Sequence, residues 1–168
     1  MTSRPRIKVS HTKITKVMEV IGWVAVVLLW SITVSCYSDL PQLAPTHFNL
    51  AGDVDAWGSK SIILSLPLVA TVLFLGMTML SRFPHTLPYP VAITRDNAVR
   101  QYTIAIMMIR YLKVTVILIF TLLMINVVQI TDGKSSGLGA WFLPIVVGLV
   151  FIPFTYFQVK LYDEAKLK

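Results

Sequence analysis

The residues of this chain most able to do chemistry lie in one polar segment between two long apolar runs. Residues 45–60 read PTHFNLAGDVDAWGSK, which brings an imidazole, carboxylates, an ammonium group and aromatic rings close together. Asn49 and Gly52 tolerate a left-handed backbone and predict a turn inside the segment. We interpret this motif loop as a binding loop for a peptide, a lipid or a partner protein. Its candidate binding residues are Pro45, His47, Phe48, Asn49, Gly52, Asp55, Trp57, Gly58 and Lys60.

Metal binding and catalysis are the alternatives for the motif loop. Asp53, Asp55 and Gly58 fit the first, third and sixth positions of an EF-hand calcium loop, but the twelfth position lacks the bidentate Glu. His47 with either aspartate could begin a transition-metal site, yet no second His or Cys follows at ligand spacing. Ser59, His47 and Asp55 supply the ingredients of a catalytic triad without a nucleophile elbow. We therefore predict no metal, no cofactor and no enzymatic activity, and expect Asp55 to pair locally with Lys60.

The composition indicates the environment in which this loop must be held. A soluble domain carries about 25% charged residues, whereas this chain of 168 residues is 14% charged and 55% hydrophobic. Its single cysteine, Cys36, excludes an intrachain disulfide. The net charge of +7 comes from basic residues that flank the apolar runs. That placement predicts contact with the lipid bilayer and no nucleic-acid partner.

The apolar runs predict an all-α fold, a polytopic four-helix transmembrane bundle forming a single membrane domain over residues 1–168. Its helices are expected at about residues 17–37, 61–80, 95–130 and 138–157, with the motif loop at 38–60. The first run spans roughly 31 Å at about 1.5 Å per residue, enough to cross the hydrocarbon core. Thr94 is expected to cap the third helix. Pro84, Pro88 and Pro90 forbid a continuous helix before it.

The distribution of lysine and arginine predicts the orientation of the bundle. The N-terminal segment, residues 81–113 and the C-terminal tail hold thirteen of these residues, whereas the other side holds only Lys60 and Lys134. The positive-inside rule then places both termini in the cytoplasm and the motif loop outside. The first apolar run is too long for a signal peptide, so we expect it to remain as a helix. His11 and His85 would lie on the opposite side from His47.

Charged side chains near the helix ends allow two interpretations each. Glu19 is either an intramembrane acid or an interfacial residue paired with Lys16 three positions earlier. Arg110 and Lys113 either extend to the interface on their aliphatic stems or form a lipid head-group or partner site.

Two amides lie near the outer end of the third helix. Asn126 and Gln129 either hydrogen-bond between helices or meet the motif loop, and the sequence favours neither.

The motif loop also resembles a known family. Its spacing, Pro-x-His-Phe-Asn-x-x-Gly-x-x-Asp-x-x-Gly-x-Lys, is similar to the bacterial membrane domain of unknown function at the N-terminus of SdpI-type immunity proteins. The run Asn97-Ala-Val-Arg100-Gln-Tyr102 resembles the same family. The resemblance covers the first three helices and implies a multi-pass protein of the bacterial cytoplasmic (inner) membrane, linked to toxin immunity or envelope signalling. The longer immunity proteins continue with helices beyond the fourth.

These observations predict a non-enzymatic immunity, envelope-signalling or binding protein that uses its outward loop. A peptide or protein partner is expected at the outer face, with Asn126, Gln129 and Arg100 as candidate supporting residues. The alternatives are a small transporter subunit, or an envelope enzyme or metal-binding protein acting through the loop. The helix centres hold no charged residue for transport, although an oligomer could assemble a pathway.

Overall fold

The computed structural model describes residues 4–7, 9 and 12–166, so Lys8, His11 and Lys168 lie outside the described residues. Within that part of the chain, four helices are long and apolar enough to cross a membrane, which confirms the all-α, four-helix transmembrane bundle. In chain order, these helices are α1 (Lys13–Tyr37), α2 (Ser65–Leu80), α3 (Ala98–Thr131) and α4 (Phe142–Glu164). A short 3-10 helix, η1 (Lys60–Leu64), leads into α2, and another, η2 (Pro84–Thr86), follows it.

Helix α2 begins at Ser65 rather than at residue 61, because Lys60–Leu64 form the 3-10 helix η1. Two further helix starts differ from the prediction for reasons of capping. Helix α1 begins at Lys13 rather than at residue 17, because the Thr12 side chain accepts a hydrogen bond from the Thr15 backbone N–H at 3.3 Å. Helix α3 begins at Ala98 rather than at residue 95. Asn97 Oδ1 accepts a hydrogen bond from the Thr94 N–H at 2.9 Å, which holds residues 94–97 in a turn. Thr94 is therefore not the helix cap.

Helix α4 is displaced toward the C-terminus of the chain relative to the prediction. It begins at Phe142 rather than at residue 138 because Gly139 has a φ of 77°, a left-handed conformation incompatible with a right-handed helix. It continues to Glu164 rather than ending at residue 157, and Pro153 lies inside it. The polar residues after 157 therefore extend the helix instead of forming a frayed tail.

The largest correction concerns the motif loop, which forms a β-hairpin. Strands β1 (Leu43–Phe48) and β2 (Val54–Ser59) pair in antiparallel fashion, with a register shift that leaves Thr46 bulged from the ladder. The predicted turn at residues 49–52 joins the strands. Alternation of side chains was too irregular, and Pro45 and Gly58 too unusual for strands, to reveal the hairpin.

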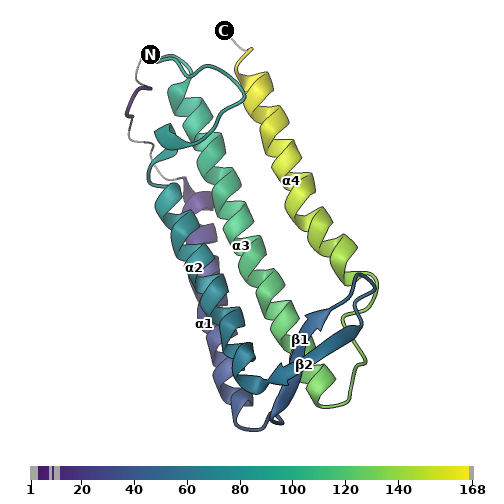
Figure 1. Cartoon of the computed structure of the whole chain (residues 1–168). Coiled ribbons are helices and arrows are strands. Elements are labelled where there is room, and N and C mark those ends of the chain that lie inside the picture. The colour runs from purple at the N-terminus through teal and green to yellow at the C-terminus, as the bar shows by residue number, and fades with distance from the viewer. Residues whose placement is uncertain (1–3, 8, 10–11, 167–168) are drawn as a thin grey trace.

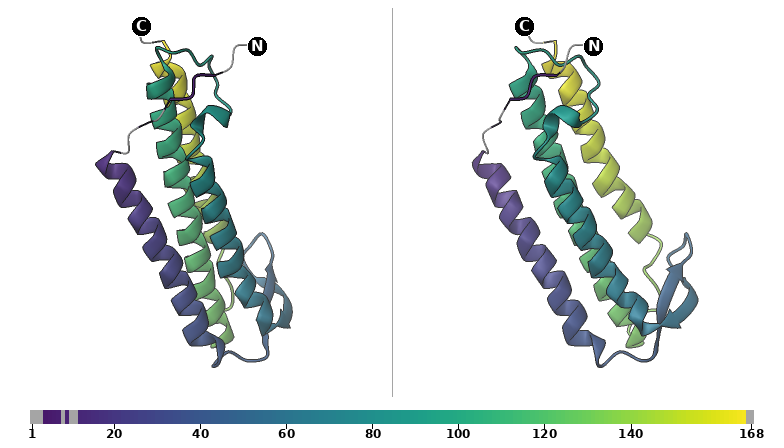
Figure 2. Two further views of the ribbon diagram at one scale, coloured as in Figure 1. Left: turned by 90° about the vertical axis from the view of Figure 1, so that its left-hand side faces the viewer. Right: turned by 60° about the vertical axis from the view of Figure 1, so that its left-hand side comes forward.

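Helix α3 forms the middle of the bundle (Figure 1). Helices α1 and α2 lie on one side of it and α4 on the other, while the hairpin and the α3–α4 connection lie together at one end. The described N-terminal residues, the loop after α2 and the end of α4 lie at the opposite end (Figure 2). Of the described residues of α4, only Leu161 is buried. Its other apolar residues are exposed or partly exposed, as expected for a helix with one face in contact with lipid.

A glycine sets the spacing between α1 and α2. A Cβ atom on Gly22 would lie 2.6 Å from the Phe74 ring, so only glycine permits this approach. The Trp23 and Phe74 rings then meet edge to face, with centroids 5.0 Å apart. Close packing at this level brings α1, α2 and α3 near enough for polar side chains to meet between them.

Candidate functional site

Asn49 organises the tip of the hairpin. Its side-chain oxygen accepts hydrogen bonds from the backbone N–H groups of Ala51 at 2.9 Å and Asp53 at 3.0 Å. Its own N–H donates to the Asp53 carbonyl at 2.9 Å. An asparagine that satisfies backbone donors in this way fixes the turn without help from another element. The contacts of Asn49 are therefore internal to the hairpin.

Gly52 joins this tip to the α3–α4 connection. Its φ is 86°, and its carbonyl accepts a hydrogen bond from the Leu138 N–H at 2.7 Å. Asp53 and Gly137 form an isolated antiparallel bridge beside it. A Cβ atom on Gly52 would lie 2.6 Å from the Gly139 carbonyl oxygen, so a larger residue cannot occupy this position without displacing the connection.

Lys60 holds the base of the hairpin against the end of α1. Its ammonium group donates to the carbonyls of Tyr37 and Leu40, each at 3.2 Å, and lies 5.0 Å from the centroid of the Tyr37 ring. A cation in contact with the last carbonyls of a helix is favoured by the helix dipole. The expected pair between Asp55 and Lys60 does not form, because the lysine is directed toward the helix end.

The remaining motif residues divide into packed and exposed groups. Pro45 is buried, Phe48 packs against the apolar core, and Gly58 lies so close to Thr46 that an added Cβ would be 2.8 Å from its Cγ2. His47 and Asp55 are exposed, and His47 Nδ1 lies 2.6 Å from Asp55 Oδ1. The Trp57 side chain is also exposed. The hairpin therefore presents His47, Asp55 and Trp57 on its surface, while most other candidate residues maintain its shape.

The three candidate supporting residues lie apart from this surface. Asn126 donates to the Leu122 carbonyl of its own helix at 2.9 Å and lines an apolar cavity of about 220 Å³ between α3 and α4. Gln129 is exposed on α3. Among the described residues, no hydrogen bond joins either side-chain amide to the hairpin. Arg100 lies at the opposite end of the bundle, where its guanidinium is 3.4 Å from the Glu164 carboxylate.

The described residues contain no group of three or more His, Cys, Asp or Glu side chains that could hold one metal ion. Asp53, a ligand in both metal alternatives, instead accepts a long hydrogen bond of 3.4 Å from the Asn49 side chain. The hairpin therefore exposes an imidazole–carboxylate pair, His47 with Asp55, and the indole ring of Trp57.

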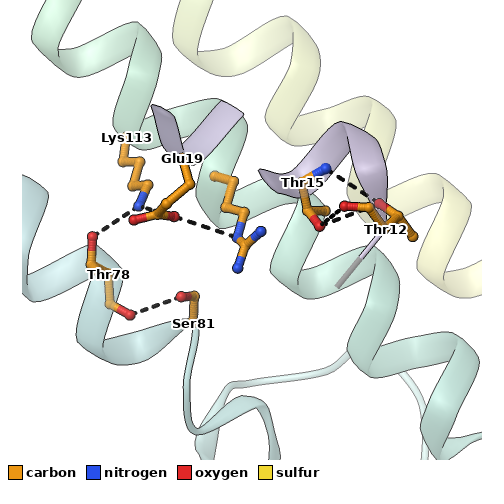
Figure 3. A network of polar contacts seen from close by, with 7 residues as sticks. Thr12, Thr15, Glu19, Thr78, Ser81 and Lys113 are labelled. Carbon is orange, nitrogen blue, oxygen red and sulfur yellow. Dashed lines mark hydrogen bonds and ion pairs between the residues drawn. The ribbon is translucent and has the colours of Figure 1, made fainter. Parts of the chain in front are cut away.

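A second polar group, inside the bundle, was missed by the sequence interpretation. Lys113 of α3 is fully buried, and its ammonium group lies 2.7 Å from Glu19 Oε2 and 2.8 Å from Thr78 Oγ1 (Figure 3). The Phe74 ring lies beneath it, with its centroid 4.4 Å away. Arg110 Nε is 3.7 Å from the same carboxylate oxygen of Glu19. This cluster connects α1, α2 and α3 by charge and hydrogen bonds.

Two expectations are corrected by this cluster. Glu19 does not pair with Lys16 along its own helix but turns inward to Arg110 and Lys113 of α3. Lys113 and Arg110 do not extend outward along the helix surface but turn to Glu19, and their side chains are 0% and 6% exposed. The signal available in the sequence was the i, i+3 spacing of Arg110 and Lys113, which places both cations on one helix face.

An aromatic cluster ties the N-terminal segment to the loop after α2. The Tyr89 hydroxyl donates to the Pro84 carbonyl at 2.8 Å, and the Arg4 guanidinium lies 5.5 Å from the Tyr89 ring centroid. Burial raises the pKa of Tyr89 well above its usual range, so the phenol stays protonated. The Tyr102 hydroxyl donates to the Pro5 carbonyl at 2.9 Å. These contacts hold the N-terminal segment and the second loop at the same end of the bundle.

Comparison with known proteins gives two partial matches. A family model described as a domain of unknown function (DUF1648) matches residues 24–71, which include most of α1, the hairpin and the start of α2. An uncharacterized protein of Archaeoglobus fulgidus is 33% identical over 86 residues, which cover 46% of this chain and 47% of the archaeal protein. The match thus spans about half the length of that relative. No solved structure matches the chain. Four apolar helices and a region similar to this domain indicate a multi-pass membrane protein, whereas the SdpI-type role stays a prediction.

Proposed function

We propose that this chain is a non-enzymatic membrane protein that binds a peptide or protein partner through the outward face of its β1–β2 hairpin. The observation that supports this role is a hairpin fixed at both ends that still exposes aromatic and apolar side chains. Leu50 at the tip is 85% exposed and Trp57 on β2 is 51% exposed. Because the backbone beneath them is already ordered, a partner would meet a preorganised surface and lose little entropy in binding.

The exposed residues have the chemistry of a binding surface. Tryptophan is enriched among residues that dominate protein interfaces, where a large apolar ring is surrounded by polar groups. Here the indole of Trp57 lies on the strand that also carries Asp55, and Asp55 is hydrogen-bonded to His47. The His47–Asp55 pair supplies a donor and acceptors that could orient a polar group of a partner whose apolar part contacts the Trp57 ring.

The proposal includes the orientation of the protein in the membrane. Thirteen of the fifteen lysine and arginine residues in the sequence belong to the N-terminal segment, residues 81–113 and the C-terminal tail. The described N-terminal residues, the loop after α2 and the end of α4 lie at the end opposite the hairpin (Figure 2). By the positive-inside rule that end is cytoplasmic, and the hairpin faces the outer side of a bacterial cytoplasmic membrane. A partner arriving from outside would meet the hairpin first, which suits a role in toxin immunity or in signalling across the envelope.

The proposal is tested by His47→Ala and Trp57→Ala in cells that lack the native copy, with each variant at equal protein level. His85→Ala, at the opposite end of the molecule, is the matched control for His47. We expect deletion to raise sensitivity to peptide toxins or to induce envelope-stress reporters. His85→Ala should restore the wild-type response, whereas both hairpin variants should resemble the deletion. Full rescue by His47→Ala and Trp57→Ala would show that the hairpin is only a scaffold.

A further inference from the structure

A cleft of about 400 Å³ lies between the beginning of α1 and the end of α2, away from the hairpin. Three cations line it: Lys16 from α1, Arg82 directly after α2, and Arg110 from α3. The acid in its wall is Glu19. The ammonium group of Lys113 lies 2.7 Å from that carboxylate, so Glu19 is already neutralised from behind the cleft. The cleft therefore keeps a strong positive charge.

The positive charge lies where a membrane surface would be. Arg82 follows Ser81, the C-cap of α2, and Lys16 lies in the first turn of α1. Both positions are at the boundary of the apolar spans. Both side chains are exposed, so they are accessible to a ligand from the membrane.

The lining becomes apolar toward the middle of the bundle. Along α1 the wall passes from Lys16 through Glu19 to Val20 and Trp23. Seven residues of helix cover about 10 Å. Val20 is 63% exposed and Trp23 is 44% exposed, so the apolar part of the wall continues onto the lipid-facing surface. The polarity thus changes over the distance that separates a lipid headgroup from its acyl chains.

We propose that this cleft binds the phosphate of an anionic phospholipid. Lys16 and Arg82 contact the phosphate oxygens, Arg110 adds positive charge from α3, and the acyl chains lie along Val20 and Trp23. Guanidinium and ammonium groups are the side chains that bind phosphate most strongly, through charge-assisted hydrogen bonds. Basic pockets between membrane helices bind such headgroups. The apolar continuation favours a lipid over free phosphate, which would use only the charged part.

The test measures lipid affinity of the purified full chain in neutral detergent micelles. Phosphatidylglycerol with a fluorescent acyl chain is titrated by anisotropy, with unlabelled phosphatidylglycerol, phosphatidylcholine and inorganic phosphate as competitors. The double variant Lys16→Gln/Arg82→Gln removes two cations of the cleft. Lys13→Gln/Arg95→Gln is the matched control, because it removes the same charge at the same end from exposed residues that do not line the cleft.

We expect the cleft variant to bind phosphatidylglycerol about thirtyfold more weakly than the wild type, about fivefold for each cation. The control variant should stay within about twofold of the wild type, and thermal unfolding should show both variants folded. Phosphatidylcholine and inorganic phosphate should compete poorly. Equal weakening by both double variants would overturn the proposal in favour of diffuse surface charge. Competition by inorganic phosphate at the same concentration as lipid would show a free-phosphate site instead.

Discussion

Lys113 carries a charge into the interior of the bundle, and its stability there depends on Glu19. Removing an ammonium group from water costs several kcal/mol, which only a close opposite charge and further hydrogen bonds can offset. Glu19 and Thr78 supply both, at 2.7 Å and 2.8 Å. Thr78 Oγ1 accepts a second hydrogen bond from the ammonium group, so the buried cation has both an opposite charge and a neutral acceptor.

This arrangement predicts a strong asymmetry between single and double substitutions. Glu19→Gln should lower the free energy of unfolding by about 3 kcal/mol, because it leaves a buried charge on Lys113. Glu19→Gln combined with Lys113→Met should recover most of that loss, since neither charge remains. Glu164→Gln, which breaks the exposed pair with Arg100, should cost at most about 1 kcal/mol. Unfolding by SDS in mixed micelles measures all three, and additive losses in the double variant would contradict the coupling.

In the hairpin, side chains of similar chemistry have different roles because folding gives only some of them backbone partners. Lys60 and Asn49 carry polar groups suited to a ligand, yet both are occupied by backbone partners. His47 and Asp55 are occupied only with each other and remain exposed. Accessibility after folding, rather than residue type, therefore separates candidate binding groups from structural ones.

At the level of elements, the junction between the hairpin tip and the α3–α4 connection predicts a measurable difference between two glycines. Gly52 and Gly133 both have positive φ, but a Cβ has no neighbour within 4 Å at Gly133 and would lie 2.6 Å from the Gly139 carbonyl at Gly52. Gly133→Ala should cost about 1 kcal/mol of unfolding free energy through backbone strain alone. Gly52→Ala should cost about 3 kcal/mol, because overpacking adds to that strain. Equal losses in SDS unfolding would show that the junction does not hold the tip.

Much of the architecture could be predicted from the sequence. Most of the features that could not be predicted depend on contacts between distant segments. Hydropathy along the chain locates the helices because crossing lipid requires a long apolar run, and prolines mark the loop before α3. The turn at Asn49 and Gly52 was also predictable, since both residues suit a left-handed backbone. The hairpin ladder was hidden by its irregular alternation and by Pro45 and Gly58. The junction at Gly137 and the pair between Glu19 and Lys113 depend on which distant segments pack together. Local patterns do not contain that information, so Lys16 was the nearest partner that could be proposed for Glu19.

At the level of the whole molecule, the two ends of the bundle differ in charge, and this predicts their accessibility. In a Cys36→Ser background the chain has no cysteine, so one can be introduced at a chosen end. Trp57→Cys on the hairpin should react with a membrane-impermeant maleimide in intact cells. Thr86→Cys, exposed in the loop after α2, should react only after permeabilisation. Labelling of Thr86→Cys alone in intact cells would reverse the orientation and remove the basis of the proposed function.

The docking of Gly52 onto residues 137–139 has a consequence for how the protein is made. The hairpin leaves the ribosome before α3 and α4 exist, so its tip has no surface to settle on until two further helices have been synthesised and inserted. The α3–α4 connection therefore completes a joint that the hairpin begins. The tip of the hairpin reaches its final arrangement only after α3 and this connection have been made.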